Sequence, residues 1–472
     1  MLNSILILMA FQASNEQPVQ PIALHPDNPH YFLFRGKPTI LISSAEHYGA
    51  VLNLDFDYIP YLDELHARDF NFTRIFVGAY VEPAGAFNIK NNTLAPASGR
   101  FICPWARSSR RGYAGGGNKF DMERWDDTYF QRLNDFCHQA SQRDIVVEVT
   151  LFCPYYEDKQ WDLAPLKASN NVNGVGNVTR TEALTMKHPS LVAVQEAMAR
   201  KVVLELRDFD NIYYEICNEP YFGGVTIDWQ NHIADIIVDG EKDNLFKHLI
   251  AQNIANGTAK IDNPNTNISI FNFHYAKPEA VKLNYGLERV IGDDETGFKG
   301  TDDLPYRSEG WRFLLAGGGL YNNLDYSFTV GKEDGTFEFP SSQPGGGGPA
   351  LRSQIKILKD FLYSFDFIKM APGDSAARFE CDTGLTPKEG VPSGATVQTM
   401  ANPGMEYAIY IQGGSQADLA LDIPAGEYLA EWVNPCTGAI DKTQEVAHKG
   451  GGLTLSSPPY SEDIALRLVL KK

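Results

Sequence analysis

The sequence predicts an α/β protein, a (β/α)8 TIM barrel followed by a C-terminal antiparallel β-sandwich. Eight short apolar runs of strand length alternate with helical patterns along most of the chain, which is typical of a parallel barrel. No glycine-rich phosphate loop follows the first run, so a doubly wound open sheet fits less well. From about residue 372 short alternating strands with Pro and Gly turns replace the helical patterns, which indicates a sandwich.

The eight barrel strands are predicted from apolar runs bounded by polar or turn residues. They are Thr39–Ser44, Phe72–Val77, Ile145–Phe152, Ile212–Cys217, Leu249–Ile254, Ile268–Phe273, Val290–Asp293 and Gly319–Asp325. Apolar residues three to four apart predict helices over 59–66, 129–136, 191–207 and 350–365. The connections over 78–126 and 153–189 are long, and both fall on the barrel face that carries sites in this architecture.

The predicted organisation has three parts: a possible signal segment over 1–19, the barrel with N-terminal extended pieces over 20–368, and the β-sandwich over 369–472. A chain of 472 residues is too long for one ordinary core, so at least two domains are expected. Apolar and charged fractions of 43% and 21% indicate a globular protein. The net charge of −18 argues against a nucleic-acid partner, which would require a basic face.

The N-terminal run from Met1 to Ala13 is apolar, short and without a basic flank. We interpret it as a weak secretion signal, in preference to a frayed strand, and expect a secreted or periplasmic protein. No segment is long and apolar enough to predict membrane insertion.

The six cysteines show neither a CxxC pair nor a zinc-ligand spacing. Cys381 and Cys436 both fall in the C-terminal region and could pair in an oxidising compartment. Cys137, Cys153 and Cys217 lie in apolar contexts and are predicted to be buried free thiols.

The strongest functional signal is the run over 211–220, an apolar aromatic stretch that stops at Asn218, Glu219 and Pro220. Proline cannot continue a central strand, so the strand ends here and presents Glu219 at its C-terminal end. Parallel barrels build their sites at that end. The alternative is an acid at a helix N-terminus or in an ion pair. A carboxylate beside an amide suits hydrolysis of a glycosidic bond, provided that a second carboxylate lies across the site.

The second carboxylate is predicted in the run over 289–297, another short apolar stretch that ends in acids and glycine. Glu295 is preferred over Asp294, because a glutamate at a strand end reaches further into a cleft. Two alternatives stay open. Glu295 could cap a helix or form an ion pair in an acidic turn. Alternatively, the acidic triplet of Asp293, Asp294 and Glu295 could bind calcium, although its spacing matches no EF-hand loop.

Four residues, Arg74, Asn218, His274 and Tyr275, are predicted to contact substrate beside this pair or to support it. Arg74 lies in mid-strand and needs a carboxylate partner if buried. It could keep a neighbouring nucleophile ionised, or form an ion pair with Glu215 at the barrel floor. His274 and Tyr275 end a strand and could hold substrate or orient a carboxylate, the alternative for the histidine being a core position. Asn218 could donate to a sugar hydroxyl.

Aromatic and basic residues of the long loops are further candidates. The loop aromatics near strand ends are Tyr155, Tyr156, Trp161 and Tyr221, of which we select Tyr155, Trp161 and Tyr221 as candidates for stacking on sugar rings. Each could instead pack within its own loop. One basic cluster, Arg107, Arg110 and Arg111, could bind a carboxylated or sulfated sugar or form a solvated loop.

Together these motifs resemble the clan A glycoside hydrolases, retaining (β/α)8-barrel enzymes typified by family 5. The segments that carry the resemblance are Tyr214–Pro220, Asn71–Arg74, the His274-Tyr275 pair and the strand end at Glu295. The whole chain more closely resembles the apiosidase-like group of family 140, through residues 28–39, 311–321 and 351–367. Residues 426–438 resemble the collagen-binding-like β-domain attached to that group.

The resemblance implies that Glu219 is the acid/base and Glu295 the nucleophile. Two departures are visible: the apiosidase-like pattern can carry Asp as acid/base, and the eighth strand lacks the tryptophan of family 5, so that Tyr321 or Tyr326 would have to serve.

The sequence therefore predicts a retaining glycoside hydrolase that cleaves O-glycosidic bonds in a polysaccharide or oligosaccharide without metal or cofactor. A catalytically inactive carbohydrate-binding protein that uses the same cleft is the second hypothesis. A metal-dependent hydrolase is the third, and the sequence shows no His/Asp ligand cluster at a useful spacing.

Overall fold

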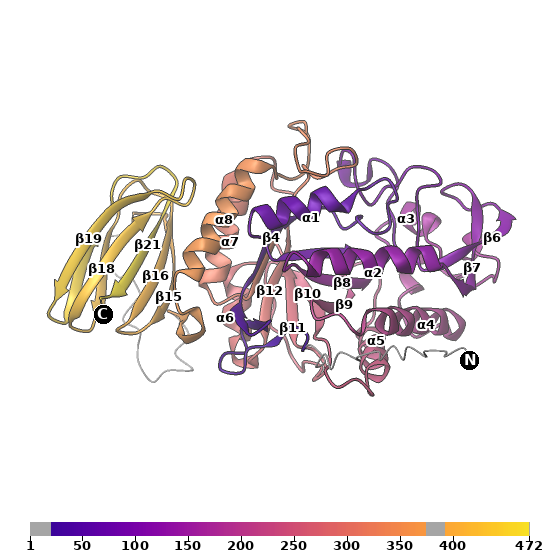
Figure 1. The fold of residues 1–472 in the computed structure, drawn as a ribbon, viewed down its shortest axis with the longest axis horizontal. Helices are drawn as coiled ribbons and strands as arrows, with labels where there is room; N and C mark the ends of the chain where they lie inside the picture. Colours follow the sequence, from indigo (N-terminus) through magenta and orange to yellow (C-terminus); the bar gives the residue numbers. More distant parts are fainter. Residues whose placement is uncertain (1–19, 374–391, 472) are drawn as a thin grey trace, which may run out of the picture.

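The computed structural model describes residues 20–373 and 392–471, which form a barrel and a separate β-domain packed beside it (Figure 1). The predicted signal segment and Cys381 lie outside the described residues, whereas Cys137, Cys153 and Cys217 are buried free thiols, as predicted. None of the helices in the described ranges is long and apolar enough to cross a membrane.

The barrel is one eight-stranded parallel sheet, which confirms the predicted fold class. In spatial order its strands are β4 (Leu41–Ala45), β13 (Leu320–Leu324), β12 (Val290–Thr296), β11 (Ile270–His274), β10 (Ile250–Asn256), β9 (Ile212–Cys217), β8 (Val146–Phe152) and β5 (Phe72–Phe76). Asn71 fastens the first strand to the last, because its side chain accepts from Ile42 N and donates to Ile40 O, both at 2.9 Å. Observed bounds differ most at β12, which runs three residues past the predicted end.

Helices cover the outside of the sheet. They are α1 (Tyr58–Ala67), α2 (Asp127–Ser141), α3 (Asp158–Leu163), α4 (Pro189–Leu206), α5 (Ile227–Gly240), α6 (Pro278–Asn284), α7 (Asp303–Leu315) and α8 (Pro349–Tyr363). Local signals explain their starts: Asp126 accepts from the backbone N–H groups of the first turn of α2, and a proline opens α4, α6 and α8. Buried apolar stripes on these helices pack against the strands.

The N-terminal end of the barrel is closed by a small antiparallel sheet of β1 (Ala23–Leu24), β2 (Phe32–Phe34) and β3 (Lys37–Thr39). Phe32 and Ile22 join a buried cluster with the first residues of the barrel strands, such as Phe72 and Val146. Because this end is plugged by side chains, only the C-terminal end of the strands is open to a ligand.

The long connection over 78–126 contains an antiparallel hairpin that the sequence analysis did not predict, formed by β6 (Trp105–Arg111) and β7 (Asn118–Trp125). The basic cluster lies on it. The Arg107 guanidinium packs over the rings of Phe120 and Tyr113, at 3.8 and 4.5 Å from their centroids. Arg110 and Arg111 are exposed.

The C-terminal domain is built from a six-stranded antiparallel sheet and a two-stranded sheet with a common apolar core. The large sheet has the order β14 (Ala371–Pro372), β15 (Thr396–Asn402), β16 (Glu406–Gln412), β21 (Asp463–Leu470), β18 (Gly426–Val433) and β19 (Ile440–His448). The small sheet pairs β17 (Asp418–Ile423) with β20 (Gly451–Ser456). Residues of β16 and β21 alternate between this core and the barrel side, as period-two strands do.

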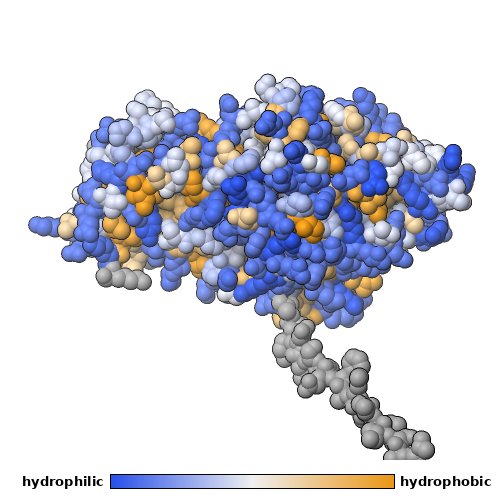
Figure 2. Space-filling view, turned by 45° about the horizontal axis from the view of Figure 1, so that its top comes forward, coloured by the Kyte–Doolittle hydropathy of each residue, from blue (hydrophilic) through white to orange (hydrophobic). Residues whose placement is uncertain are grey.

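The β-domain packs on α7 through a buried contact. The rings of Trp311 and Tyr410 stack with centroids 5.2 Å apart. Beside them Arg307 forms a bidentate pair with Asp463, at 2.9 and 3.1 Å. The face in Figure 2 is largely hydrophilic, with apolar patches scattered over it.

Candidate active site

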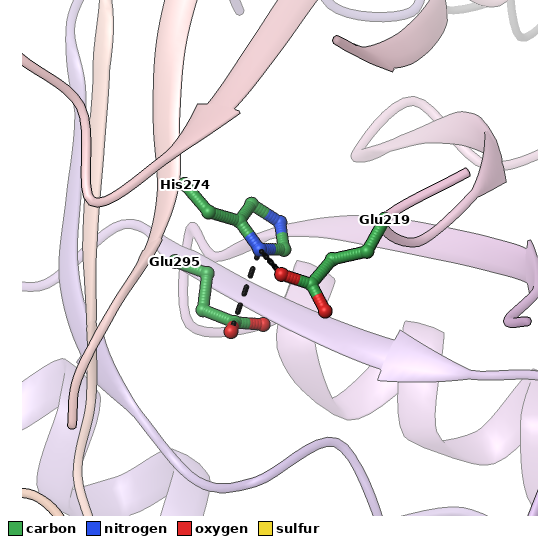
Figure 3. Close-up of side chains that lie close together, drawn as sticks. All are labelled: Glu219, His274 and Glu295. Atoms are coloured by element: carbon green, nitrogen blue, oxygen red, sulfur yellow. Dashed lines mark hydrogen bonds and ion pairs between the residues drawn. The ribbon is translucent and has the colours of Figure 1, made fainter. Parts of the chain in front are cut away.

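Three strands bring Glu219, His274 and Glu295 together at the open end of the barrel (Figure 3). β9 ends at Cys217, and Asn218 and Glu219 follow it directly. The backbone of Glu219 is left-handed, with a φ of 34°. His274 is the last residue of β11. Glu295 lies inside β12, where the ladder to both neighbouring strands is interrupted by a register shift. Such an irregularity re-aims a side chain, and here it allows both Asp294 and Glu295 to serve the interior of the barrel.

The imidazole of His274 stands between the two glutamates. Its Nδ1 lies 3.1 Å from Glu219 Oε1 and 3.4 Å from Glu295 Oε1. One ligand atom from each of the three residues lies within 4.8 Å of the other two, so the two carboxylates face each other at short range. This spacing suits a site in which one carboxylate attacks and the other protonates, and it is shorter than the roughly 6.5–9.5 Å of inverting sites.

Glu295 is held as a carboxylate. The hydroxyls of Tyr48 and Tyr275 donate to its two oxygens at 2.9 and 2.8 Å, and Arg74 Nη1 lies 3.5 Å away. Burial opposes ionisation, but the charge and hydrogen bond of His274, the charge of Arg74 and the hydrogen bond of Tyr275 outweigh it and hold the pKa of Glu295 well below its usual range. A nucleophilic carboxylate requires this state.

His274 carries the complementary charge. Burial alone would lower the pKa of its imidazole, but the charges of Glu295 and Asp294 and the hydrogen bond to Glu219 raise it well above the usual value. These surroundings favour the protonated, cationic form of the ring.

Glu219 is oriented by a relay of hydrogen bonds that begins inside the barrel. Arg74 Nη2 donates to Asn218 Oδ1 at 2.8 Å, and the Asn218 amide donates to the Tyr156 hydroxyl at 2.8 Å. The Tyr156 hydroxyl donates to Glu219 Oε2 at 2.6 Å, and the Tyr221 hydroxyl lies 3.2 Å from Glu219 Oε1. Asn218 lines the cavity, but both ends of its amide are engaged in this relay.

Arg74 is fully buried and does not line the cavity, so its predicted contact with substrate is wrong. It fills both supporting roles considered from the sequence, since it pairs with Glu215 at the barrel floor and also lies beside the nucleophile candidate. Its Nε additionally contacts Asp294 at 3.4 Å and Glu148 at 3.8 Å. The guanidinium therefore connects the barrel floor to the site.

The acidic triplet does not act as one ligand set. Asp293 accepts from the backbone N–H of Ala276, whereas Asp294 joins Glu148 and Glu215 in the interior, and Glu295 joins the site. The structure thus gathers two groups close enough to hold a metal, Glu219-His274-Glu295 and Glu148-Glu215-Asp294, where the sequence spacing had shown none. The second group surrounds the Arg74 guanidinium, which already supplies positive charge.

A cavity of about 370 Å³ opens above the two glutamates. Of the predicted site residues, Asn218, Glu219, Tyr275 and Glu295 line it. His274 lies just beneath it, fully buried, and Tyr221 borders a neighbouring cavity. His47, Tyr48 and Glu82 also line the cavity, although the sequence did not predict them there. The first two follow β4 within the run Ala45-Glu-His-Tyr48, a strand-end signal of the same kind as the one at Glu219.

Two predicted stacking residues are wrong. Tyr155 is 1% exposed and donates to Ala79 O at 2.9 Å, and Trp161 is 3% exposed and donates to Val178 O at 3.0 Å. Trp161 packs within its own loop and Tyr155 packs against the connection over 78–126, whereas Tyr156 lines the cavity.

Tyr321 and Tyr326, the residues expected to replace the family 5 tryptophan, do not line the cavity. Tyr321 is buried and donates to Tyr306 O at 2.6 Å, and Tyr326 packs behind the rings of His47 and Phe298.

No protein-family model matches the chain, and no curated protein sequence is significantly similar to it. Solved structures are similar in fold. A glycoside hydrolase family 5 protein from Bacteroides vulgatus is 13% identical with a TM-score of 0.62, the match covering 95% of this chain and 93% of that one. A second glycoside hydrolase is 12% identical with a TM-score of 0.62, covering 95% and 97%.

A family 5 mannosidase from Rhizomucor miehei is 12% identical with a TM-score of 0.50, covering 73% of this chain and 98% of that one. At these identities the likeness shows a shared fold. The (β/α)8 barrel of this chain is therefore similar in fold to the barrels of these glycoside hydrolases.

Proposed function

We propose that the protein is a retaining glycoside hydrolase with Glu295 as nucleophile and Glu219 as acid/base. The observation that carries the proposal is the facing pair of carboxylates at the ends of two barrel strands, one of which is held ionised by buried positive charge. The barrel fold shared with family 5 enzymes supports it.

The charges of the site fit a double displacement. Glu295 attacks the anomeric carbon and loses its negative charge as the ester forms, while Glu219 gives its proton to the leaving oxygen and gains a negative charge. The His274 cation lies between them, at 3.4 and 3.1 Å, so it stabilises whichever carboxylate is ionised. In the second half, Glu219 takes a proton from water, and the water oxygen releases the sugar from Glu295 with its anomeric configuration retained.

The finer assignments are also proposals. The grouping with the apiosidase-like family 140 and the action on an oligosaccharide or polysaccharide rest on the resemblance of the sequence. Secretion rests on the apolar N-terminal run.

The test compares single variants on aryl glycosides with good leaving groups and on alkyl glycosides with poor ones. Glu219→Ala should lose roughly 10²–10⁴-fold on the alkyl substrates and much less on the activated ones, because good leaving groups need little protonation. Added azide should then give a glycosyl azide of retained configuration. Glu295→Ala should lose turnover on both classes, and azide should give the inverted product, identified by NMR.

An equal loss on both substrate classes for Glu219→Ala would contradict its acid role. Binding of oligosaccharides by the native protein without any turnover on the whole panel would instead support the inactive carbohydrate-binding protein.

A further inference from the structure

The cavity has a deep polar wall, formed by His47, Tyr48 and Glu82, all of them buried. The Tyr48 hydroxyl bonds Glu295, and its ring stacks near that of His47. His47 Nε2 lies 3.7 Å from Glu82 Oε2, and Glu82 also accepts from the Tyr80 hydroxyl at 3.0 Å. This polar wall adjoins the nucleophile candidate Glu295, so we place the sugar whose anomeric carbon is attacked against it.

The mouth of the cavity has the opposite chemistry. Phe87, Phe222 and Phe298, here called the aromatic rim, line the cavity and are 41%, 43% and 41% exposed. In the described part of the chain no other phenylalanine is exposed to this degree. Solvent-exposed apolar rings that gather at one place mark a binding surface, whereas isolated ones are common.

The three rings come from three different loops and are connected through Tyr156. The Phe87 ring lies 6.3 Å from that of Phe298 and 5.4 Å from that of Tyr156, centroid to centroid. Tyr156 in turn contacts the Phe222 ring at 5.8 Å. Phe87 and Phe298 both have left-handed backbones, with φ of 52° and 55°, which bulky residues adopt only when their surroundings enforce it. The fold therefore holds Phe87 and Phe298 of the aromatic rim in place.

The rim continues from the acid/base candidate. Tyr156, which contacts two of the rim rings, donates to Glu219, and Phe222 follows Glu219 by three residues. The acid protonates the oxygen of the leaving group, so the leaving group departs on this side of the cavity. On this side the cavity is lined mainly by aromatic rings, with the Asn256 amide beside them.

We propose that the aromatic rim binds an apolar leaving group, so that the enzyme removes a sugar from an alkyl or aryl aglycone. This inference rests on the proposed glycosidase function. It replaces the saccharide leaving group expected from the sequence with an alkyl or aryl group. The sugar lies against the polar wall, and the aglycone lies between the three phenylalanine rings.

The test uses one sugar, chosen as the best glycone on a panel of 4-nitrophenyl glycosides of both anomers. Methyl and octyl glycosides of that sugar are compared, because their leaving groups have nearly equal basicity and differ in apolar length. The octyl glycoside should have a kcat/KM roughly tenfold or more above that of the methyl glycoside, mostly through KM. A disaccharide with the same terminal sugar should fall near the methyl glycoside.

Phe222→Ser and Phe87→Ser should each reduce the ratio of octyl to methyl kcat/KM severalfold, and Phe222→Leu should restore most of it. Leu283→Ser is the matched control, since Leu283 is half exposed on α6 and lies outside the cavity, and it should leave the ratio unchanged. Circular dichroism and thermal melting check that each variant folds.

Three outcomes overturn the inference. An octyl-to-methyl ratio near one would show that the rim does not bind the aglycone. A disaccharide preferred over the octyl glycoside would assign the rim to the face of a second sugar. No hydrolysis of any glycoside, the activated aryl ones included, would overturn the proposed function and this inference with it.

Discussion

His274 Nε2 lies 3.5 Å from Asp294 Oδ1, on the side of the ring opposite Nδ1 and the two site glutamates. Both side chains are fully buried, and neither oxygen of Asp294 has a hydrogen-bond partner among the described residues. Asp294 immediately precedes Glu295, so one strand places one acid behind the imidazole and the next acid beside it. The charge of His274 is therefore coupled to the ionisation of both.

Replacing His274 with Gln should move the acidic limb of the pH–rate profile to higher pH. Burial raises the pKa of Glu295, and the imidazolium is the first group that opposes it, so without that charge Glu295 protonates at a higher pH. We expect a loss of kcat of roughly 10²-fold at neutral pH. The measurement is kcat/KM against pH on an aryl glycoside.

Tyr275→Phe serves as its control, because it removes a hydrogen bond to Glu295 but no charge. Its acidic limb should shift less. Identical limbs for the His274 variant and the native enzyme would show that the imidazole does not control Glu295.

Replacing Asp294 with Asn should make the protein more stable at neutral pH. Burial raises the pKa of Asp294 from 3.8 to about 7, against the opposing charges of Arg74 and His274. Between these values the folded state holds a proton that the unfolded state releases, so this group makes stability fall as pH rises through that window. The Asn variant lacks this pH-dependent loss of stability. It should therefore melt at a higher temperature than the native protein at about pH 8, with a smaller difference at about pH 4.

Asp262→Asn, on an exposed side chain, provides the comparison for the loss of one negative charge. Melting curves of the Asp294 variant that run parallel to the native ones at all pH values would contradict the raised pKa.

Replacing Asp463 with Ala should destabilise the whole chain by about 3–5 kcal/mol, because it leaves the buried Arg307 guanidinium without its bidentate partner. The Tyr410 hydroxyl, which donates to Asp463 at 2.8 Å, loses its acceptor as well. Urea unfolding measures the change. Glu462→Ala removes the other, half-exposed carboxylate of Arg307 and should cost no more than about 1 kcal/mol. Equal effects of the two variants would mean that burial does not govern this contact.

Deleting the chain after Asp366 should cost folding or solubility, although the two proposed catalytic groups lie in the barrel. The deletion removes Tyr410 from the face of Trp311 and exposes Phe361, which packs on the same indole at 4.8 Å. Expression, gel filtration and activity of the truncated barrel are the measurements. A truncated barrel that stays monomeric and fully active would identify the β-domain as an independent appendage.

The sequence by itself predicted the eight barrel strands along the chain and an acid near the C-terminal end of two of them, because both are local signals. A strand shows as an apolar run, and Pro220 ends one strand just where Glu219 must turn into the cavity. Burial of Cys137, Cys153 and Cys217 as free thiols followed from the same runs.

Only the tertiary structure decided which side chains meet. Tyr155 and Tyr156 are neighbours in one loop, and the backbone turns the first into the protein and the second onto Glu219, a choice that composition does not encode. The side chains of Asp293, Asp294 and Glu295 point in different directions for a similar reason, since the irregular hydrogen-bond ladder at β12 sets where each one points. His274 and the three rim phenylalanines come from separate strand ends and loops, and they become neighbours only when the sheet closes into a barrel. Their contacts depend on that closure, which is set by long-range packing rather than by any local stretch of sequence.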